Sequence, residues 1–87
     1  MEKELRERVQ LAGGLCIKTR AIGTRGFFDR VIVLPGRVVF CEVKRPRGGR
    51  VSVHQIRYLS MFLKLGVEAC VVRNSGDIDR LLSATRP

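Results

Sequence analysis

The chain has 87 residues, which is too short for more than one domain, and its hydrophobic share of 45% is too high for a disordered protein. Its 17 Lys and Arg against 8 Asp and Glu give a net charge of +9, which favours a polyanionic partner, with nucleic acid first. We find no signal peptide and no apolar run long enough to cross a membrane, so we expect one cytoplasmic domain over residues 1–87.

The first half of the chain predicts one helix followed by three strands. Leu5 and Val9 are spaced to share one helix face, and Gly13-Gly14 marks the end of that helix. A Pro35-Gly36 turn, which suits type II geometry, joins the last two strands into a hairpin. The expected elements are a helix at 2–12, a strand at 15–20, a loop at 21–26, and hairpin strands at 29–34 and 37–44.

The second half predicts a basic loop, a helix, a strand and a short final helix. Ser52 is placed to cap the longer helix, and Gly66 is placed to end it. The expected elements are a loop at 45–50, a helix at 53–65, a strand at 68–73, a turn at 74–76 and a helix at 77–82. The order α-β-β-β-α-β-α predicts an α/β fold in which helices flank a small mixed sheet.

The three cysteines are not spaced as metal ligands. They are odd in number, far apart and set among apolar residues, and no CxxC or Cys/His spacing is present. We therefore expect no zinc site, and we interpret each as a small buried hydrophobic residue of a reduced, intracellular protein: Cys16, Cys41 and Cys70.

Two carboxylates are predicted to meet across the hairpin. Counting outward from a Pro35-Gly36 turn places Asp29 directly opposite Glu42, with Cβ atoms about 4.5–5.5 Å apart. Like charges in that arrangement are destabilising, and a hard divalent cation such as Mg²⁺ compensates them. Because side chains alternate along a strand, Lys44 lies on the same face as Glu42. In a phosphodiester site this lysine can stabilise negative charge or orient the attacking water.

Each of these residues also has a simpler interpretation. Glu42 and Lys44 alone could be a solvated ion pair at the end of a strand. A bulge that shifted the register by one residue would move Asp29 to the other face of the hairpin. The prediction of a metal site therefore depends on the hairpin register.

Two further polar residues lie on apolar helix faces. Glu2 shares the face of the first helix that carries Leu5 and Val9, and Gln55 lies on the apolar face of the second helix. Both are expected to point toward the sheet. The alternatives are that Glu2 is a terminal charge favoured by the helix dipole and that Gln55 is a boundary residue.

Basic residues are expected on both sides of the carboxylate pair. One group precedes Asp29 and the other follows Lys44, so a phosphate backbone could be held from both sides, although about half of these side chains could simply be solubilising charges. His54 is a candidate base, or a surface residue that contacts DNA. The predicted DNA-binding residues are Lys18, Arg20, Arg25, Arg45, Arg47 and Arg50.

The stretch from Gly26 to Gln55 resembles the VRR-NUC (virus-type replication-repair nuclease) family of the PD-(D/E)xK nuclease superfamily. The matching pieces are Gly26-Phe27-Phe28-Asp29, the hairpin, Glu42-Val43-Lys44, a basic glycine-rich loop, and Ser52 and Gln55 at the start of a helix. The helix that ends at Gly13-Gly14 resembles the family's first helix, with the family's glutamate at Glu2. One departure stands out, because the family usually has Pro where this chain has Phe28.

The resemblance implies a restriction-endonuclease-like α-β-β-β-α-β core and a Mg²⁺- or Mn²⁺-dependent endonuclease. Small stand-alone members, mostly from phages and bacteria, act as homodimers on branched DNA such as four-way junctions, so the partners implied are branched DNA and a second copy. By carry-over, the site residues are the metal ligands Asp29, Glu42 and the Val43 carbonyl, the catalytic Lys44, and the supporting Glu2 and Gln55.

Two other functions compete with the nuclease. A non-catalytic DNA-binding module on a nuclease-like fold would bind DNA without cleaving it, and the intact set of Asp29, Glu42 and Lys44 is an argument against it. A basic ribosome-associated protein would have no use for paired carboxylates. We therefore take a nuclease that acts on branched DNA as the leading hypothesis.

Overall fold

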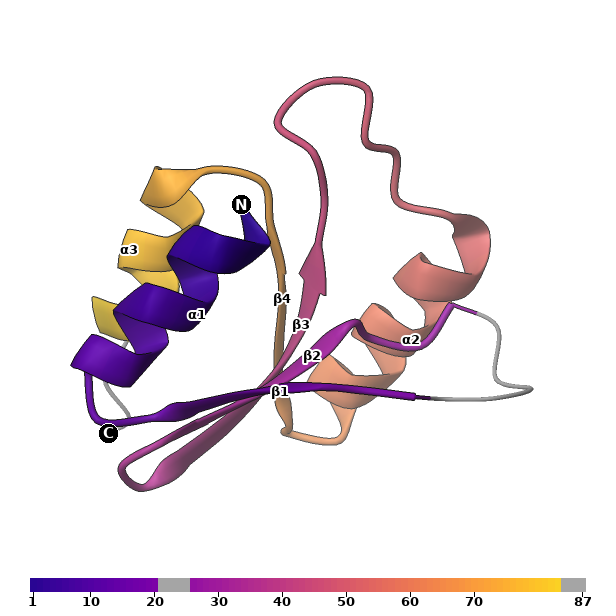
Figure 1. Ribbon diagram of the computed structural model, residues 1–87. Coiled ribbons are helices and arrows are strands. Elements are labelled where there is room, and N and C mark those ends of the chain that lie inside the picture. Colours follow the sequence, from indigo (N-terminus) through magenta and orange to yellow (C-terminus); the bar gives the residue numbers. More distant parts are fainter. Residues whose placement is uncertain (21–25, 84–87) are drawn as a thin grey trace.

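The computed structural model describes residues 1–20 and 26–83, and these contain the elements in the predicted order (Figure 1). The start of the chain forms helix α1, and the hairpin and crossover follow. The bounds are α1 Glu2–Leu11, β1 Leu15–Lys18, β2 Arg30–Leu34, β3 Arg37–Val43, α2 Val53–Lys64, β4 Glu68–Val72 and α3 Ser75–Ser83. The predicted α/β class is therefore confirmed.

The strands form one mixed sheet in the order β1-β2-β3-β4. The first three strands are antiparallel neighbours, whereas β4 runs parallel to β3. A parallel neighbour requires a crossover connection, and α2 supplies it. Figure 1 shows α1 and α3 together on one side of the sheet and α2 on the other.

The main core lies between the sheet and the pair of helices α1 and α3. Leu5 and Val9 of α1 are fully buried there, as their spacing predicts. Arg8 of α1 also pairs with Asp79 of α3 at 2.5 Å, which ties the two helices together. The buried cluster comprises Leu5, Val9, Ile32, Leu34, Val39, Cys41, Val72, Ile78 and Leu81.

The opposite side of the sheet is covered less completely. Its centre is an aromatic cluster in which the ring centroids of contacting pairs lie 4.9–6.5 Å apart, formed by Phe27, Phe28, Phe40, Tyr58 and Phe62. Helix α2 contains no fully buried residue. On the sheet beside it, three side chains on the α2 side are about half exposed, and we call them the open apolar face: Leu15, Ile17 and Val38.

Element boundaries differ from prediction by one or two residues, and one short element was wrong. Residues 74–76 were expected to be a turn, but α3 already begins at Ser75. The side chain of Asn74 explains this, because its Oδ1 accepts a hydrogen bond from the Asp77 backbone N–H at 2.9 Å and so caps the helix. The turn at Gly36 has φ of 72°, as a type II turn requires at that position.

The prediction that all three cysteines are buried was correct for one. Cys41 is buried in the main core, while Cys16 and Cys70 are only half-buried at its margin. All three are free thiols. No helix of residues 1–20 and 26–83 is long and apolar enough to cross a membrane.

Candidate active site

The hairpin keeps the predicted register up to the carboxylate pair. Val31 pairs with Phe40, and Arg30 pairs with Cys41 without a bulge. Asp29 comes directly before β2, and its Oδ2 accepts a hydrogen bond from the Val43 backbone N–H at 3.0 Å. The side chain of Asp29 is thereby held across the hairpin, next to Glu42.

Glu42 is a buried carboxylate with one unsatisfied oxygen. The residue is 3% exposed, and its Oε2 has no hydrogen-bond partner among the described residues. Burial and the neighbouring Asp29 carboxylate raise the pKa of Glu42 to about 8, against the opposing influence of Lys44. A buried acceptor without a donor is costly, so this position calls for a proton or a cation.

Lys44 brings a positive charge to the same face of the hairpin. Its Nζ lies 3.7 Å from Glu42 Oε1, and its side chain is only 18% exposed. Its backbone N–H donates to the Val72 carbonyl at 2.9 Å, so β4 fixes the backbone just beyond the end of β3. Lys44 also lines a hollow of about 230 Å³ together with Glu2 and Val43.

Glu2 lies at the edge of this site and is paired with an arginine. Its Oε2 accepts from Arg30 Nη2 at 3.1 Å, while its side chain remains 52% exposed. Glu2 lines the hollow beside Lys44 and also a second one of about 220 Å³ beside Asp29. Glu2 was expected to point toward the sheet, and its side chain does reach Arg30 of β2.

Arg30 was not singled out from the sequence, although a signal for it exists. It is an arginine in a strand that otherwise reads Val-Ile-Val-Leu, and it is only 9% exposed. A buried arginine needs an acceptor, and the helix glutamate with the same inward orientation is Glu2. The sequence therefore offers Glu2 as a candidate partner for Arg30, and the packing of α1 on the sheet brings the two together.

Gln55 is placed at the start of α2 but not in either hollow. Its side-chain Oε1 accepts from the Ser52 backbone N–H at 2.9 Å, and its own N–H donates to Ser52 Oγ at 3.2 Å. The two residues form a capping box, which fixes the first turn of the helix. That turn packs against Gly26, where an added Cβ would lie 2.4 Å from the His54 Cβ.

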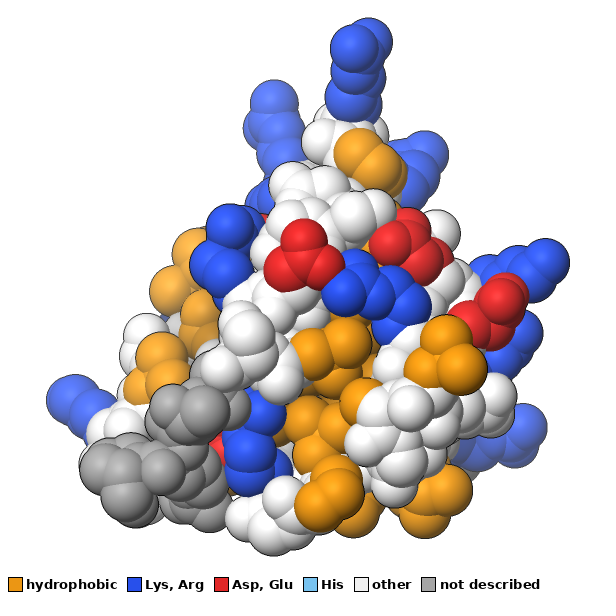
Figure 2. Space-filling view, turned by 90° about the vertical axis from the view of Figure 1, so that its left-hand side faces the viewer, with side chains coloured by type: hydrophobic (Ala, Val, Ile, Leu, Met, Phe, Trp, Pro, Cys, Tyr) orange, Lys and Arg blue, Asp and Glu red, His pale blue; other side chains and the backbone are white. Residues whose placement is uncertain are grey.

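The predicted DNA-binding residues fall in two places. Three exposed arginines lie in the loop after β3, which projects at the top of Figure 1. Lys and Arg side chains also extend from the top of the molecule in Figure 2. Lys18 lines the hollow beside Asp29, and Arg20 is exposed. Arg25 lies outside the described residues. The loop arginines are Arg45, Arg47 and Arg50.

The donor set fits a hard divalent cation. Within residues 1–20 and 26–83, no three or more His, Cys, Asp or Glu side chains form a metal-binding group. Mg²⁺ does not need such a cage, because it is commonly held by one or two carboxylates with water and phosphate. The unsatisfied oxygen of Glu42 next to the Asp29 carboxylate meets that requirement.

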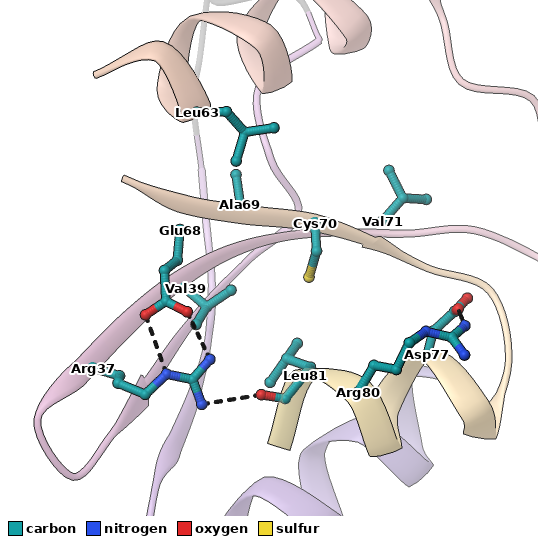
Figure 3. Close-up of a pocket in the computed structure, with 10 residues that line it drawn as sticks. All are labelled: Arg37, Val39, Leu63, Glu68, Ala69, Cys70, Val71, Asp77, Arg80 and Leu81. Atoms are coloured by element: carbon teal, nitrogen blue, oxygen red, sulfur yellow. Dashed lines mark hydrogen bonds and ion pairs between the residues drawn. The ribbon is translucent and has the colours of Figure 1, made fainter. Parts of the chain in front are cut away.

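A third hollow, larger than the two beside the carboxylates, lies away from them. It has a volume of about 310 Å³ and is lined by residues of β3, α2, β4 and α3 (Figure 3). Arg37 and Glu68 in this hollow form an ion pair, in which Arg37 donates hydrogen bonds to the Glu68 carboxylate at 2.7 and 3.1 Å. Arg37 also donates to the Leu81 carbonyl at 3.0 Å. Arg37 is at the turn end of β3, and Glu42 is near the other end. This hollow adds no group to the candidate active site.

Comparison with known proteins identifies the family to which this fold belongs. No protein-family profile matches the sequence. A solved structure described as a VRR_NUC domain superposes with a TM-score of 0.86, at 31% identity, over 98% of this chain and 92% of the other. The chain belongs to the VRR-NUC family. Among individual proteins, it is 34% identical over 85 residues to "Putative nuclease p44" of Acyrthosiphon pisum secondary endosymbiont phage 1, covering 97% of this chain and 89% of that protein.

The structure accounts for the phenylalanine that replaces the family's usual proline. Phe28 is 3% exposed, and its ring centroid lies 4.9 Å from that of Phe62 in α2 and 5.8 Å from that of Phe40 in β3. Its carbonyl accepts a hydrogen bond from Thr19 Oγ1. The aromatic ring thus anchors the segment before Asp29 by packing.

Proposed function

We propose that this protein is a Mg²⁺- or Mn²⁺-dependent endonuclease that hydrolyses phosphodiester bonds in branched DNA, with four-way junctions as the preferred substrate. The observation that carries the proposal is the buried, unpartnered Oε2 of Glu42 beside Asp29, with the Lys44 ammonium 3.7 Å from the other oxygen. Membership of a nuclease family supports the same reaction.

The metal would be held by Asp29, Glu42 and the Val43 carbonyl. A bound divalent cation lowers the pKa of a coordinated water and neutralises charge on a phosphoryl oxygen. Asp29 is oriented for this role by the Val43 N–H at 3.0 Å. Lys44 is held by its backbone bond to Val72, so that its ammonium can stabilise negative charge on the phosphate or position the attacking water.

DNA would be held at the end of the molecule that carries the site. Lys18 lines the hollow beside Asp29 and Arg45 lines the hollow beside Lys44, while Arg47 and Arg50 are exposed on the same loop. Their charges attract the phosphate backbone irrespective of base sequence. Selectivity for branched DNA then depends on how the two halves of a junction are presented to active sites, which is a question of oligomeric state.

We expect cleavage in Mn²⁺ or Mg²⁺ of a four-way junction, with a flap cut more slowly and linear duplex most slowly. The measurement is an endonuclease assay on these three substrates, with a chelator control and with Asp29→Asn as the inactive control. Absence of cleavage of all three in either metal, with DNA binding retained, would contradict the nuclease and favour the non-catalytic binding module.

We also propose that the protein is a homodimer that buries the open apolar face together with the outer side of α2. A second copy suits this surface because apolar side chains are exposed on both of its parts: Leu15, Ile17 and Val38 on the sheet, and Ile56 and Met61 on α2. A domain of this size also buries only about 60% of its chain surface alone. The dimer would present paired active sites to a junction.

Ile17→Asp is expected to weaken the dimer by more than about tenfold, because it places a carboxylate in an apolar interface. The measurement is sedimentation velocity over a range of protein concentrations, with circular dichroism to confirm folding. Lys3→Asp is the matched control, because Lys3 is 81% exposed on α1. A wild-type protein that stays monomeric at about 100 μM would exclude a functional dimer of this kind. A Kd of about 100 μM corresponds to a dimerisation free energy of only roughly 5.5 kcal/mol.

A further inference from the structure

The arginine-rich loop after β3 is closed at its base by contacts from β4 and the residue that follows it. We call residues 45–50 the basic loop. At its start, the backbone N–H of Lys44 donates to the Val72 carbonyl at 2.9 Å. At its end, Arg73 Nη1 donates to the Gly49 carbonyl. Successive residues of the same segment therefore hold both ends of the loop.

The two ends of the basic loop are packed directly against each other. A Cβ added at Gly49 would lie 2.9 Å from both the N and the O of Arg45, and 3.2 Å from the Cβ of Lys44. Only glycine allows this approach. The end of the loop thus rests on Lys44 itself, and Arg45 and Arg47 project from a closed turn.

Arg73 is itself held in place. It is half-buried, and its backbone N–H donates to Asp77 Oδ2 at 2.8 Å. The same carboxylate pairs with Arg80, and the Arg73 backbone contact lowers the pKa of Asp77, which keeps it ionised. Within the part of the chain that the structure describes, the Arg73 guanidinium has no carboxylate partner, and its hydrogen bond is to the loop carbonyl.

We propose that Arg73 is a positioning residue that holds the basic loop closed on Lys44, so that the loop arginines are pre-arranged for the phosphate backbone. The inference rests on the proposed function and adds a residue to it. Nothing in the Glu-Val-Lys motif predicts this role, because Arg73 lies on the next strand connection, far from the motif in sequence.

The physical effect of the anchor is on binding more than on chemistry. A loop already fixed in its bound conformation loses less conformational entropy when DNA binds. Lys44 keeps its separate backbone bond to Val72 when Arg73 is removed. Loss of Arg73 should therefore raise the DNA concentration needed for half-maximal rate and leave kcat nearly unchanged.

Limited trypsin digestion tests the anchor without reference to activity. Trypsin sites exist after Arg47 and Arg50, while Arg45 is protected by the following Pro46. We expect Arg73→Met to speed cleavage at these sites about tenfold, because a hydrogen bond to a charged group is lost. Arg73→Lys, which keeps a donor and the charge, should fall between Arg73→Met and the wild type. Lys64→Met, on exposed α2 surface, should match the wild type.

A second variant tests the same contact from the loop side. Gly49→Ala leaves Arg73 intact but forces the loop away from Arg45, so its digestion should be accelerated like that of Arg73→Met. Melting temperatures of all variants separate local opening from global unfolding. Equal digestion rates for wild type, Arg73→Met and Gly49→Ala would overturn the anchor.

Kinetics then connect the anchor to the reaction. With a four-way junction in Mn²⁺, Arg73→Met should raise the half-saturating DNA concentration about fivefold and change kcat less than about twofold, since the loss is of pre-organisation. A fall in kcat with unchanged half-saturation would overturn the positioning role. If wild-type protein does not cleave DNA, the proposed function fails, while the digestion result still decides whether Arg73 anchors the loop.

Discussion

Replacing Lys44 with Met is expected to lower the rate of DNA cleavage by about 10²–10³-fold, the usual effect of removing a group that stabilises charge in a transition state. The reason is its position, with the ammonium 3.7 Å from Glu42 Oε1 in a nearly buried setting. Binding to the same DNA should change less than about twofold, because we expect the exposed arginines of the basic loop to make most of the phosphate contacts. Single-turnover cleavage in Mn²⁺ and binding in chelator measure the two effects separately.

Lys64→Met is the matched control for this prediction, because it removes the same charge from the exposed surface of α2. It should leave both cleavage and binding close to wild type. Lys44→Met with an unchanged cleavage rate would remove the lysine from the mechanism. A loss of cleavage that follows a parallel loss of DNA binding would instead assign Lys44 to substrate binding.

Replacing Glu42 with Gln is expected to make the metal-free protein more stable near pH 8 and to abolish cleavage. Burial and Asp29 raise the pKa of Glu42 from 4.5 to about 8 in the folded protein. The folded state therefore holds the Glu42 proton more tightly than the unfolded state does. The stability that this protonated carboxyl contributes is present in full below pH 4.5 and is lost as the pH rises toward about 8. Glutamine occupies the same space without a charge.

The expected gain for Glu42→Gln at pH 8 is about 1–3 kcal/mol in the free energy of unfolding, measured by urea denaturation without metal. At pH 4 the two proteins should differ little. Mn²⁺ should raise the melting temperature of the wild type and leave that of the variant unchanged. Glu7→Gln on α1, where Glu7 is 54% exposed, is the control. A Glu42→Gln protein that is less stable than wild type at pH 8 without metal would contradict the prediction.

The hairpin that carries the site could be predicted in detail because local rules determine it. A Pro-Gly turn fixes the pairing of the flanking strands, and the period of two then fixes the face of each side chain. Those rules correctly placed Val31 opposite Phe40. The same count put Asp29 opposite Glu42, and the Asp29 side chain accepts a hydrogen bond from the backbone N–H of the next residue, Val43. The order of helices and strands followed from periodicity and glycine positions in the same way.

Contacts between segments far apart in the sequence could not be predicted by those rules. The Arg30–Glu2 pair joins a strand to the first helix, and the Arg73–Gly49 contact joins a strand end to a loop. Each depends on how elements pack in three dimensions. Gln55 illustrates a competition, because the helix N-terminus uses its side chain for the capping box. The turn predicted before α3 was wrong for a local reason, since Asn74 caps that helix.

The aromatic cluster gives the molecule a built-in optical reporter. The chain has no Trp and a single Tyr. Aromatic absorption and fluorescence at wavelengths longer than those of Phe therefore come from Tyr58 alone. The ring of Tyr58 meets Phe27 edge-on with centroids 5.5 Å apart, and Phe27 is two residues from Asp29. Ion binding at the carboxylates or a movement of α2 can therefore be followed by tyrosine fluorescence and near-ultraviolet circular dichroism in the unlabelled protein.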